Sequence, residues 1–295
     1  MIYNNQQKEA ITTLLEQKRA LKPNDSDAAF ARKHSITSVD YSNLVNRKWI
    51  AQPSLLSEKK WNRIALIAGY RANGQQKWET ADTYVSDYVR TLLKTSQNTS
   101  LPTVLVDAPG IGKSHTCIKY VEHEDNSFYV RCSDCPTNSR LIKAIAKSMG
   151  LSPNKKTEDL MEDITIYANS IYRPILILDE AGFLRPKAWN VVHRIYNACE
   201  FQLSLFLVGS VGLENEITKG IRRKSNGYEE VFSRLGSKYI NIFKDEADKQ
   251  KRLLSDFKKV IKAQGIKQSK KIEDIISKSN DLRRVRREVV KIQRT

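Results

Sequence analysis

Five short apolar runs, separated by longer helical patterns, constrain the fold of this chain more than any other feature. They lie at residues 103–106, 128–131, 174–178, 205–208 and 239–242. Strands that alternate with helices are typical of a parallel sheet covered by helices. The segments on either side of this block have helical patterns. We therefore predict an α/β core over residues 78–243, a helical N-terminal domain over 1–70, a polar linker over 71–77 and a short helical lid over 244–295.

The first apolar run leads into the loop DAPGIGKS, residues 107–114, and then into a helical pattern. This strand–loop–helix order is that of a phosphate-binding loop. Gly110 and Gly112 allow successive backbone N–H groups to converge on phosphate oxygens at the positive end of the following helix. Asp107 stands where the common pattern has its first glycine. Because aspartate tolerates turns, we predict a working site, with an affinity that the carboxylate charge weakens.

Lysine, serine and two acidic residues are the candidates for phosphate binding, Mg²⁺ ligation and activation of water. Lys113 is expected to contact the β- and γ-phosphates of ATP, and Ser114 to ligate Mg²⁺. The run at 174–178 ends in Asp179 and Glu180. At the end of a strand beside a phosphate loop, the first acid would hold Mg²⁺ through water and the second would activate the attacking water.

The run at 205–208 is followed by Gly209 and Ser210. In a parallel sheet this strand end lies beside the first two motifs, so the Ser210 hydroxyl is a candidate sensor of the γ-phosphate. A simple turn from strand to loop explains the same residues equally well.

The order of these motifs, followed by FSRL at 232–235 and NDLR at 280–283, resembles the AAA+ ATPases. The resemblance implies an AAA+ core, and an arginine, Arg234, that reaches the nucleotide of a neighbouring subunit, so that hydrolysis requires an oligomer. It implies that Arg283, or Arg284 one position later, contacts phosphates within its own subunit. Surface arginines are the alternative interpretation.

The segment before the core, WET at 78–80, resembles the part of related ATPases that covers the adenine. A buried core tryptophan is an equally good interpretation. The predicted nucleotide-contacting residues are Trp78, Thr80, Pro109, Gly110, Ile111, Gly112, Lys113, Ser114, His115, Asp179 and Arg283. The predicted catalytic residues are Lys113, Glu180, Ser210 and Arg234.

Residues 27–49 have the pattern of two short helices joined by a tight turn, which resembles a repressor-like helix-turn-helix. Ser35 stands where many such turns have glycine. The second helix is expected to begin near Ser38. The side chains expected to face outward are Thr37, Ser38, Asp40 and Asn43, with Arg47 and Lys48 at the helix end. Ser38, Asn43 and Arg47 are the candidate DNA contacts. A three-helix domain that binds protein is the alternative.

The charge balance favours a polyanionic partner. Fifty Lys and Arg residues against 33 Asp and Glu residues give a formal net charge of +17. Such a chain attracts nucleic acid, and basic side chains neutralise phosphates without reading bases. In an AAA+ ring or helix, the segments after the second strand and beyond the acidic pair face the central channel. The candidate DNA contacts there are Arg131, Arg140 and Lys187. The basic cluster at 222–224, with Arg222 and Arg223, is a further candidate. For each of these residues a solvated surface position is the alternative.

A helix-turn-helix domain, a short AAA+ core and a basic lid together resemble the MuB-type target-selecting ATPases of phage Mu and related transposons. The resemblance implies that ATP-bound subunits polymerise on double-stranded DNA, as a helical filament or a ring, with little sequence preference. It also implies delivery of that DNA to a MuA-like DDE transposase, which the protein activates and which stimulates hydrolysis.

Three other functions fit part of the pattern. A helicase-loading ATPase related to IstB and DnaC shares the core, although the N-terminal helix-turn-helix argues against it. A nucleotide-switched DNA-binding regulator predicts sequence-specific binding and slow turnover. A DNA-coating protein with a degenerate nucleotide site has Asp107 in its favour, whereas the intact Lys113, Asp179 and Glu180 argue against it.

Composition also limits the surroundings of the protein. The sequence has no run of about 18 apolar residues, and MIYNNQQKEA lacks the apolar core of a signal peptide. Cys132 and Cys135 have metal-ligand spacing, but no second pair completes a zinc site. We therefore expect structural thiols, a reducing cytoplasm and no membrane partner.

Overall fold

A computed structural model describes residues 3–70, 78–225 and 227–294, so the predicted linker at 71–77 lies outside the described residues. The chain divides into two compact units. One comprises residues 1–77 with 143–164, and the other comprises residues 78–142 with 165–295. Helix α8 (Asn138–Ser148) and helix α9 (Thr157–Ser170) each run from one unit into the other. Among the described residues, none of the helices combines the length and the hydrophobicity that crossing a bilayer requires.

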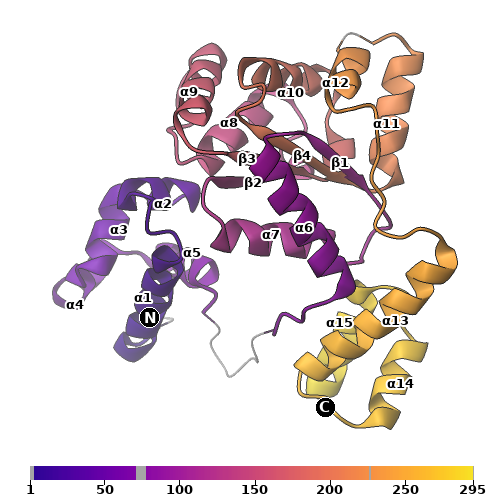
Figure 1. The fold of residues 1–295 in the computed structure, drawn as a ribbon. Coiled ribbons are helices and arrows are strands. Elements are labelled where there is room, and N and C mark those ends of the chain that lie inside the picture. Colours follow the sequence, from indigo (N-terminus) through magenta and orange to yellow (C-terminus); the bar gives the residue numbers. More distant parts are fainter. Residues whose placement is uncertain (1–2, 71–77, 226, 295) are drawn as a thin grey trace. The chain divides into compact units, whose positions relative to one another are not determined.

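A parallel sheet forms the centre of the larger unit (Figure 1). Its strands are β1 (Thr103–Val106), β2 (Ser127–Arg131), β3 (Ile175–Asp179) and β4 (Ser204–Gly209). They stand in the order β1-β4-β3-β2, with every neighbouring pair parallel. This order brings the carboxyl ends of β1, β3 and β4 to one edge. The first predicted run coincides with β1, and the next three lie within one residue of β2, β3 and β4.

The fifth predicted run, 239–242, does not form a full strand. Only Ile240 pairs with β1, through an isolated bridge to Leu105. Two side chains replace the next bonds of the ladder. The Asn241 amide donates to the Val106 carbonyl at 2.8 Å, and the Ile242 N–H donates to the Asp107 carboxylate at 2.7 Å.

Helices cover both faces of the sheet, and β3 and β4 are therefore buried along their whole length. Helix α6 (Tyr84–Thr99) contacts β4 and lies beside α7 (Lys113–His123), which contacts β2 (Figure 1). The remaining elements of this part are η2 (Cys132–Asp134), η3 (Ala181–Phe183), α10 (Pro186–Ala198), α11 (Val211–Arg222) and α12 (Tyr228–Arg234).

The lid consists of α13 (Glu246–Ala263), α14 (Ser269–Ser277) and α15 (Leu282–Arg294). Val285 and Val289 of α15 are fully buried in the same core cluster as Leu105 and Phe206 of the sheet. The buried Asp256 carboxylate of α13 accepts hydrogen bonds from the first backbone N–H groups of α6. These N–H groups have no partner within their own helix, so the lid caps α6 as well as packing against the core.

The smaller unit begins with a bundle of short helices around one core. Its elements are α1 (Asn5–Ala20), α2 (Asp27–Lys33), α3 (Ser38–Val45), α4 (Lys48–Ala51), η1 (Pro53–Leu55) and α5 (Glu58–Ala68). The core contains Phe30 and Ala31 of α2, Leu44 of α3 and the tryptophans at 49 and 61. Thr37 caps α3, because its side chain accepts a hydrogen bond from the Asp40 N–H.

Two features of the turn between α2 and α3 bear on the sequence predictions. Ser35 has a φ of 56°, the left-handed conformation that glycine adopts without strain. Asp40, expected to face outward, is instead buried on the inner side of α3. Its carboxylate pairs with Lys60 of α5 at 2.8 Å, so that expectation was wrong.

Replacing Ser35 with glycine is expected to stabilise the pair of helices α2 and α3 by about 0.5–1 kcal/mol, because the left-handed strain of an L-residue is removed. Slower hydrogen exchange of the α2 and α3 amides would report the gain. Ser42→Gly, on the exposed side of α3, is the matched control and should lose about 0.5 kcal/mol or less, the difference in helix propensity between serine and glycine. If both variants exchange faster than the parent protein, the serine at position 35 is not strained.

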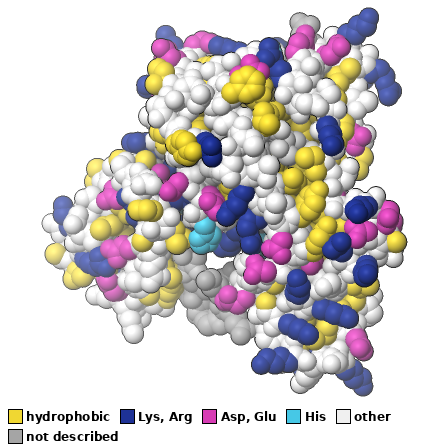
Figure 2. Space-filling model, in the orientation of Figure 1, with side chains coloured by type: hydrophobic (Ala, Val, Ile, Leu, Met, Phe, Trp, Pro, Cys, Tyr) yellow, Lys and Arg dark blue, Asp and Glu magenta, His cyan; other side chains and the backbone are white. Residues whose placement is uncertain are grey.

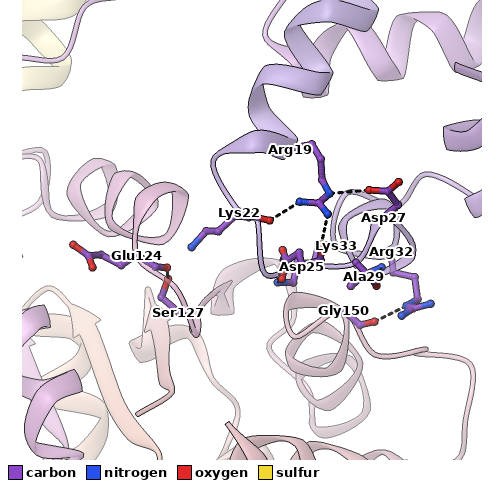
Figure 3. A network of polar contacts seen from close by, with 11 residues as sticks. Arg19, Lys22, Asp25, Asp27, Ala29, Arg32, Lys33, Glu124, Ser127 and Gly150 are labelled. Atoms are coloured by element: carbon purple, nitrogen blue, oxygen red, sulfur yellow. Dashed lines mark hydrogen bonds and ion pairs between the residues drawn. The ribbon is translucent and has the colours of Figure 1, made fainter. Parts of the chain in front are cut away.

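The unit also contains a contact between residues distant in sequence (Figure 3). The Arg32 guanidinium of α2 donates to the Gly150 carbonyl, while Arg19 donates to the carbonyls of Lys22 and Asp25. Gly150 has a φ of 80°, and a Cβ there would approach the Cβ of Ala29 to 3.0 Å. Only glycine therefore suits this position, where the chain turns close against α2.

Candidate nucleotide-binding site

A pocket of about 750 Å³ lies in the larger unit, at the edge where β1, β3 and β4 end. It brings together residues that the sequence predicts from segments far apart in the chain. The predicted residues that line it are Trp78, Thr80, Pro109, Gly110, Gly112, Lys113, Ser114, His115, Asp179, Glu180, Ser210 and Arg283. Ile111 lies in the buried core instead. Arg131, predicted as a DNA contact, also lines the pocket because β2 ends beside β3.

The loop between β1 and α7 needs its two glycines for conformational reasons. Gly110 and Gly112 have φ values of 78° and 110°, in the left-handed region. A Cβ at Gly110 would also clash with the Asp281 side chain, which comes from the start of the lid helix α15. The Gly110 carbonyl accepts a hydrogen bond from the Leu282 N–H at 3.0 Å. The loop is therefore shaped by the lid as well as by its own sequence.

Asp107 holds the start of this loop and does not need to be glycine. Its backbone stays outside the left-handed region. One carboxylate oxygen accepts the Ala108 N–H at 2.7 Å, and the other accepts the Ile242 N–H at the same distance. Both oxygens therefore bind backbone groups at the base of the loop.

The ammonium group of Lys113 lies within the loop. It donates to the carbonyls of Asp107 and Ala108, each at 2.7 Å. The side chain is buried, and this burial lowers the pKa of Lys113 to about 8. The group is thus charged at neutral pH and held where a desolvated cation attracts phosphate strongly.

The acidic pair at the end of β3 is held by side chains from β2 and from the turn η2 that follows it. The buried Asp179 carboxylate accepts hydrogen bonds from the Glu180 N–H at 2.9 Å and from the Tyr129 hydroxyl at 2.7 Å. The Ser133 hydroxyl donates to the Glu180 carboxylate. Glu180 itself has a φ of 55°, a strained conformation for a non-glycine residue.

Comparisons with known proteins agree with this geometry. Residues 97–216 match the model of a family described as AAA domain. The fold is that of an AAA+ domain. It is similar to the structure of the Orc1 protein of Aeropyrum pernix in complex with DNA, with a TM-score of 0.50 and 16% sequence identity. The match covers 71% of this chain but only 58% of the Orc1 chain. No curated protein matches the chain.

The pocket of the AAA+ domain offers donors that fit Mg²⁺. Ser114 and Asp179 both line it and supply oxygen ligands, which this cation prefers. The described residues contain no cluster of three or more His, Cys, Asp or Glu side chains suited to holding a metal. That donor set suits an ion held by one or two protein oxygens together with nucleotide phosphates.

The remaining predicted catalytic residues differ in their positions. Ser210 lines the pocket and caps α11, with its hydroxyl 3.4 Å from the Gly212 N–H. Arg283 also lines the pocket, whereas Arg284 pairs with Glu288 within α15. Arg234 is not among the lining residues; its guanidinium lies 3.5 Å from the Glu200 carboxylate. The structure therefore gives Arg234 no role in the pocket of its own chain.

The other predicted DNA contacts are mostly exposed. Arg140, Lys187, Arg222 and Arg223 lie on the surface of the larger unit, and Ser38 lies on the surface of α3. Asn43 is half-buried. Arg47 forms ion pairs with Glu9 and Glu16 at 2.9 Å and 2.7 Å. A DNA phosphate would have to compete with both carboxylates for this guanidinium.

The cysteines have a structural environment. All four are free and buried. Burial raises the pKa of Cys135 to about 11 and that of Cys132 well above its usual value, so both thiols are protonated at neutral pH.

The pKa of Lys113 predicts how ATP binding depends on pH. The ammonium form attracts phosphates, so affinity is greatest below pH 8 and falls as the pH rises through that value. Because bound phosphates would raise the pKa, the dissociation constant for ATP should increase about tenfold between pH 7 and pH 9. Titration calorimetry at several pH values would measure it. In Lys113→Arg the cation remains charged, so the trend should disappear; an equally steep trend in that variant would assign the titration to another group.

Proposed function

We propose that this protein is an ATP-dependent AAA+ ATPase that binds double-stranded DNA with little sequence preference and polymerises on it. The observation that carries the proposal is the assembly of Lys113, Asp179 and Glu180 in one pocket, from which Arg234 is absent. Arg234 would act on the nucleotide of a neighbouring subunit, as the AAA+ resemblance implies, and its position outside the pocket of its own chain is consistent with that role. Mg²⁺ held by Ser114, Asp179 and the phosphates would neutralise charge that develops on the γ-phosphate.

Different residues of the pocket would have different roles in hydrolysis. The loop N–H groups and Lys113 bind the phosphates, and Ser210 and Arg283 line the pocket around them. Glu180 would accept a proton from the attacking water. To do so its carboxylate must leave the hydroxyl of Ser133, which holds it in the present structure.

DNA binding is supported by charge and by composition of the surface. The net charge of +17 favours nonspecific, salt-sensitive contact with phosphates. Lys and Arg side chains gather on the visible face of the lid (Figure 2). The helix-turn-helix presents Ser38 and Val39 to solvent, and the similar Orc1 structure was solved in complex with DNA.

The finer part of the proposal is that the polymer selects target DNA and delivers it to a DDE transposase. Its support is the motif order shared with MuB-type ATPases, combined with a helix-turn-helix, an AAA+ core and a basic lid. In this scheme the transposase cuts and joins the DNA, and its contact with the polymer stimulates hydrolysis and release.

A nucleotide-switched DNA-binding regulator is the second candidate. It is favoured by the outer face of α3, where Ser38, Val39 and Ser42 are exposed and suited to contact in a groove. This candidate requires one preferred DNA sequence, whereas the first requires indifference to sequence.

Electron microscopy on plasmid DNA with ATP, with ADP and without nucleotide would separate the candidates. Continuous polymers that form only with ATP are expected for the proposed function, and addition of a transposase should then shorten their lifetime. Particles at one locus, independent of nucleotide, would support the regulator and contradict the proposal.

A further inference from the structure

The carboxylate of Asp179 is buried and yet lines the nucleotide pocket. A buried carboxylate needs hydrogen-bond donors, because burial without them costs free energy. Two donors from the described part of the chain meet it. The Glu180 N–H reaches Oδ1 at 2.9 Å, and the Tyr129 hydroxyl reaches Oδ2 at 2.7 Å. Each carboxylate oxygen has about two acceptor sites, so each retains one for a group in the pocket.

The pairing of β2 with β3 places Tyr129 beside this carboxylate. Tyr129 stands opposite Ile177, two residues before Asp179. Residues two apart on a strand share one face of the sheet, so the tyrosine and the aspartate lie on the same face, one step apart. The ring packs against the hydrophobic core, and Tyr129 is not among the residues that line the pocket. Tyr129 can therefore affect a bound ligand only through Asp179.

The bond between Tyr129 and Asp179 has a fixed direction. A phenol has one hydrogen to donate, and an ionised carboxylate can only accept it. On its other side the hydroxyl takes part in a hydrogen bond with Arg131, which raises the pKa of that guanidinium. The neutral hydroxyl satisfies the carboxylate without cancelling its negative charge, whereas a lysine or arginine bonded to the same oxygen would cancel it. Asp179 thus keeps its full attraction for a cation.

We propose that Tyr129 is a positioning residue that orients the Asp179 carboxylate for Mg²⁺, an inference that rests on the proposed nucleotide site. With one hydrogen bond on each oxygen, the carboxylate cannot turn away from the pocket without losing a bond. Its free acceptor sites are then already directed to the ion and its waters. Hydrogen-bond partners of metal ligands typically contribute about ten- to a hundredfold to metal affinity. Because Asp179 is expected to hold the ion through water, we expect the lower end of this range.

A purely structural role is the alternative for Tyr129. In that case the hydroxyl only satisfies a buried carboxylate, and its removal lowers the stability of the fold. The two roles differ in the ligand that they affect. A positioning residue strengthens the binding of ATP with Mg²⁺ but not the binding of ATP without metal. A structural residue affects both forms of the ligand alike, or neither.

The test is titration calorimetry of the full-length protein with ATP, once in excess Mg²⁺ and once in excess EDTA. Tyr129→Phe keeps the ring and removes only the hydroxyl. Its dissociation constant for ATP should rise about tenfold in Mg²⁺ and change by less than about twofold in EDTA. Tyr120→Phe is the matched control, because the Tyr120 hydroxyl bonds the Gln97 side chain at 2.5 Å in the same core, away from the pocket. This variant should bind ATP like the parent protein under both conditions.

A double-mutant cycle shows whether Tyr129 acts through Asp179. Asp179→Asn should by itself weaken binding in Mg²⁺, because the charge that attracts the ion is lost. Adding Tyr129→Phe to that variant should then weaken binding by less than about twofold, since the group that the hydroxyl orients is already impaired. A further tenfold loss would mean that Tyr129 acts by another route and would overturn the inference.

Equal losses in Mg²⁺ and EDTA for Tyr129→Phe, or no loss in either, would also overturn it. Failure of the proposed site itself gives a different result, because the parent protein would then bind no ATP, or bind it equally well with and without Mg²⁺. Thermal unfolding of both phenylalanine variants measures the cost to the fold. Should Tyr129→Phe unfold at the assay temperature, all proteins are compared in sucrose, which stabilises the folded state.

Discussion

Replacement of Glu180 by glutamine is expected to slow ATP hydrolysis about a hundredfold to a thousandfold while leaving ATP affinity nearly unchanged. Glutamine keeps the size of the side chain but cannot accept a proton from the attacking water. Lys113, Ser114 and Asp179 still bind the phosphates and Mg²⁺ in this variant. The protein should therefore remain ATP-bound and assembled on DNA. Phosphate release and the dissociation constant for ATP would measure the two effects.

Glu79→Gln is the matched control for this experiment. Glu79 is exposed beside the pocket but does not line it, so the same chemical change there should leave turnover unaltered. Normal turnover in Glu180→Gln would show that another group activates the water. A parallel loss of ATP affinity would instead show that Glu180 holds the ligand.

Lys113→Ala is expected to weaken ATP binding about a hundredfold and to abolish ATP-dependent assembly on DNA. The ammonium group is buried beside the loop carbonyls, so its loss leaves phosphate charge without a desolvated partner. Calorimetry and electron microscopy would measure the two losses. A variant that still coats DNA only when ATP is present would contradict gating by nucleotide.

Loss of folding must be separated from loss of binding in that variant. Thermal unfolding without nucleotide serves this purpose, because the parent protein and Lys113→Ala are then compared without ligand stabilisation. Similar unfolding temperatures would assign the loss of assembly to the site. Lys113→Arg adds a second comparison, since it retains the charge but presents it on a planar group.

The sequence predicted the sheet well because its signal is local. Buried strands in a parallel sheet are continuous apolar runs, and four of these runs became strands. The run at 239–242 failed for a reason that lies elsewhere in the chain. The side chains of Asn241 and Asp107 take up backbone groups that a full ladder would use.

The pocket was predicted in part. Motifs with fixed spacing, such as the loop around Lys113, identify their own residues. Ser133 and Tyr129 carry no such motif; they contact the acidic pair because β2 lies beside β3. Arg286 also lines the pocket. In the sequence it is one of several arginines in a basic helix, and only the packing of α15 places it there. Residues whose place in the site depends on tertiary packing cannot be recognised from a single sequence.

The position of Asp107 has a consequence for recognising such proteins by pattern. A glycine at 107 would supply no acceptors for the N–H groups of Ala108 and Ile242. Aspartate is therefore an alternative to glycine at this position. Its carboxylate binds the backbone of the loop and of the neighbouring segment, whereas glycine contributes only conformational freedom. Search expressions that require glycine at the first position would discard chains built in this way. Allowing aspartate there, when the last apolar run contains an asparagine followed by an apolar residue as at Asn241 and Ile242, would retain them.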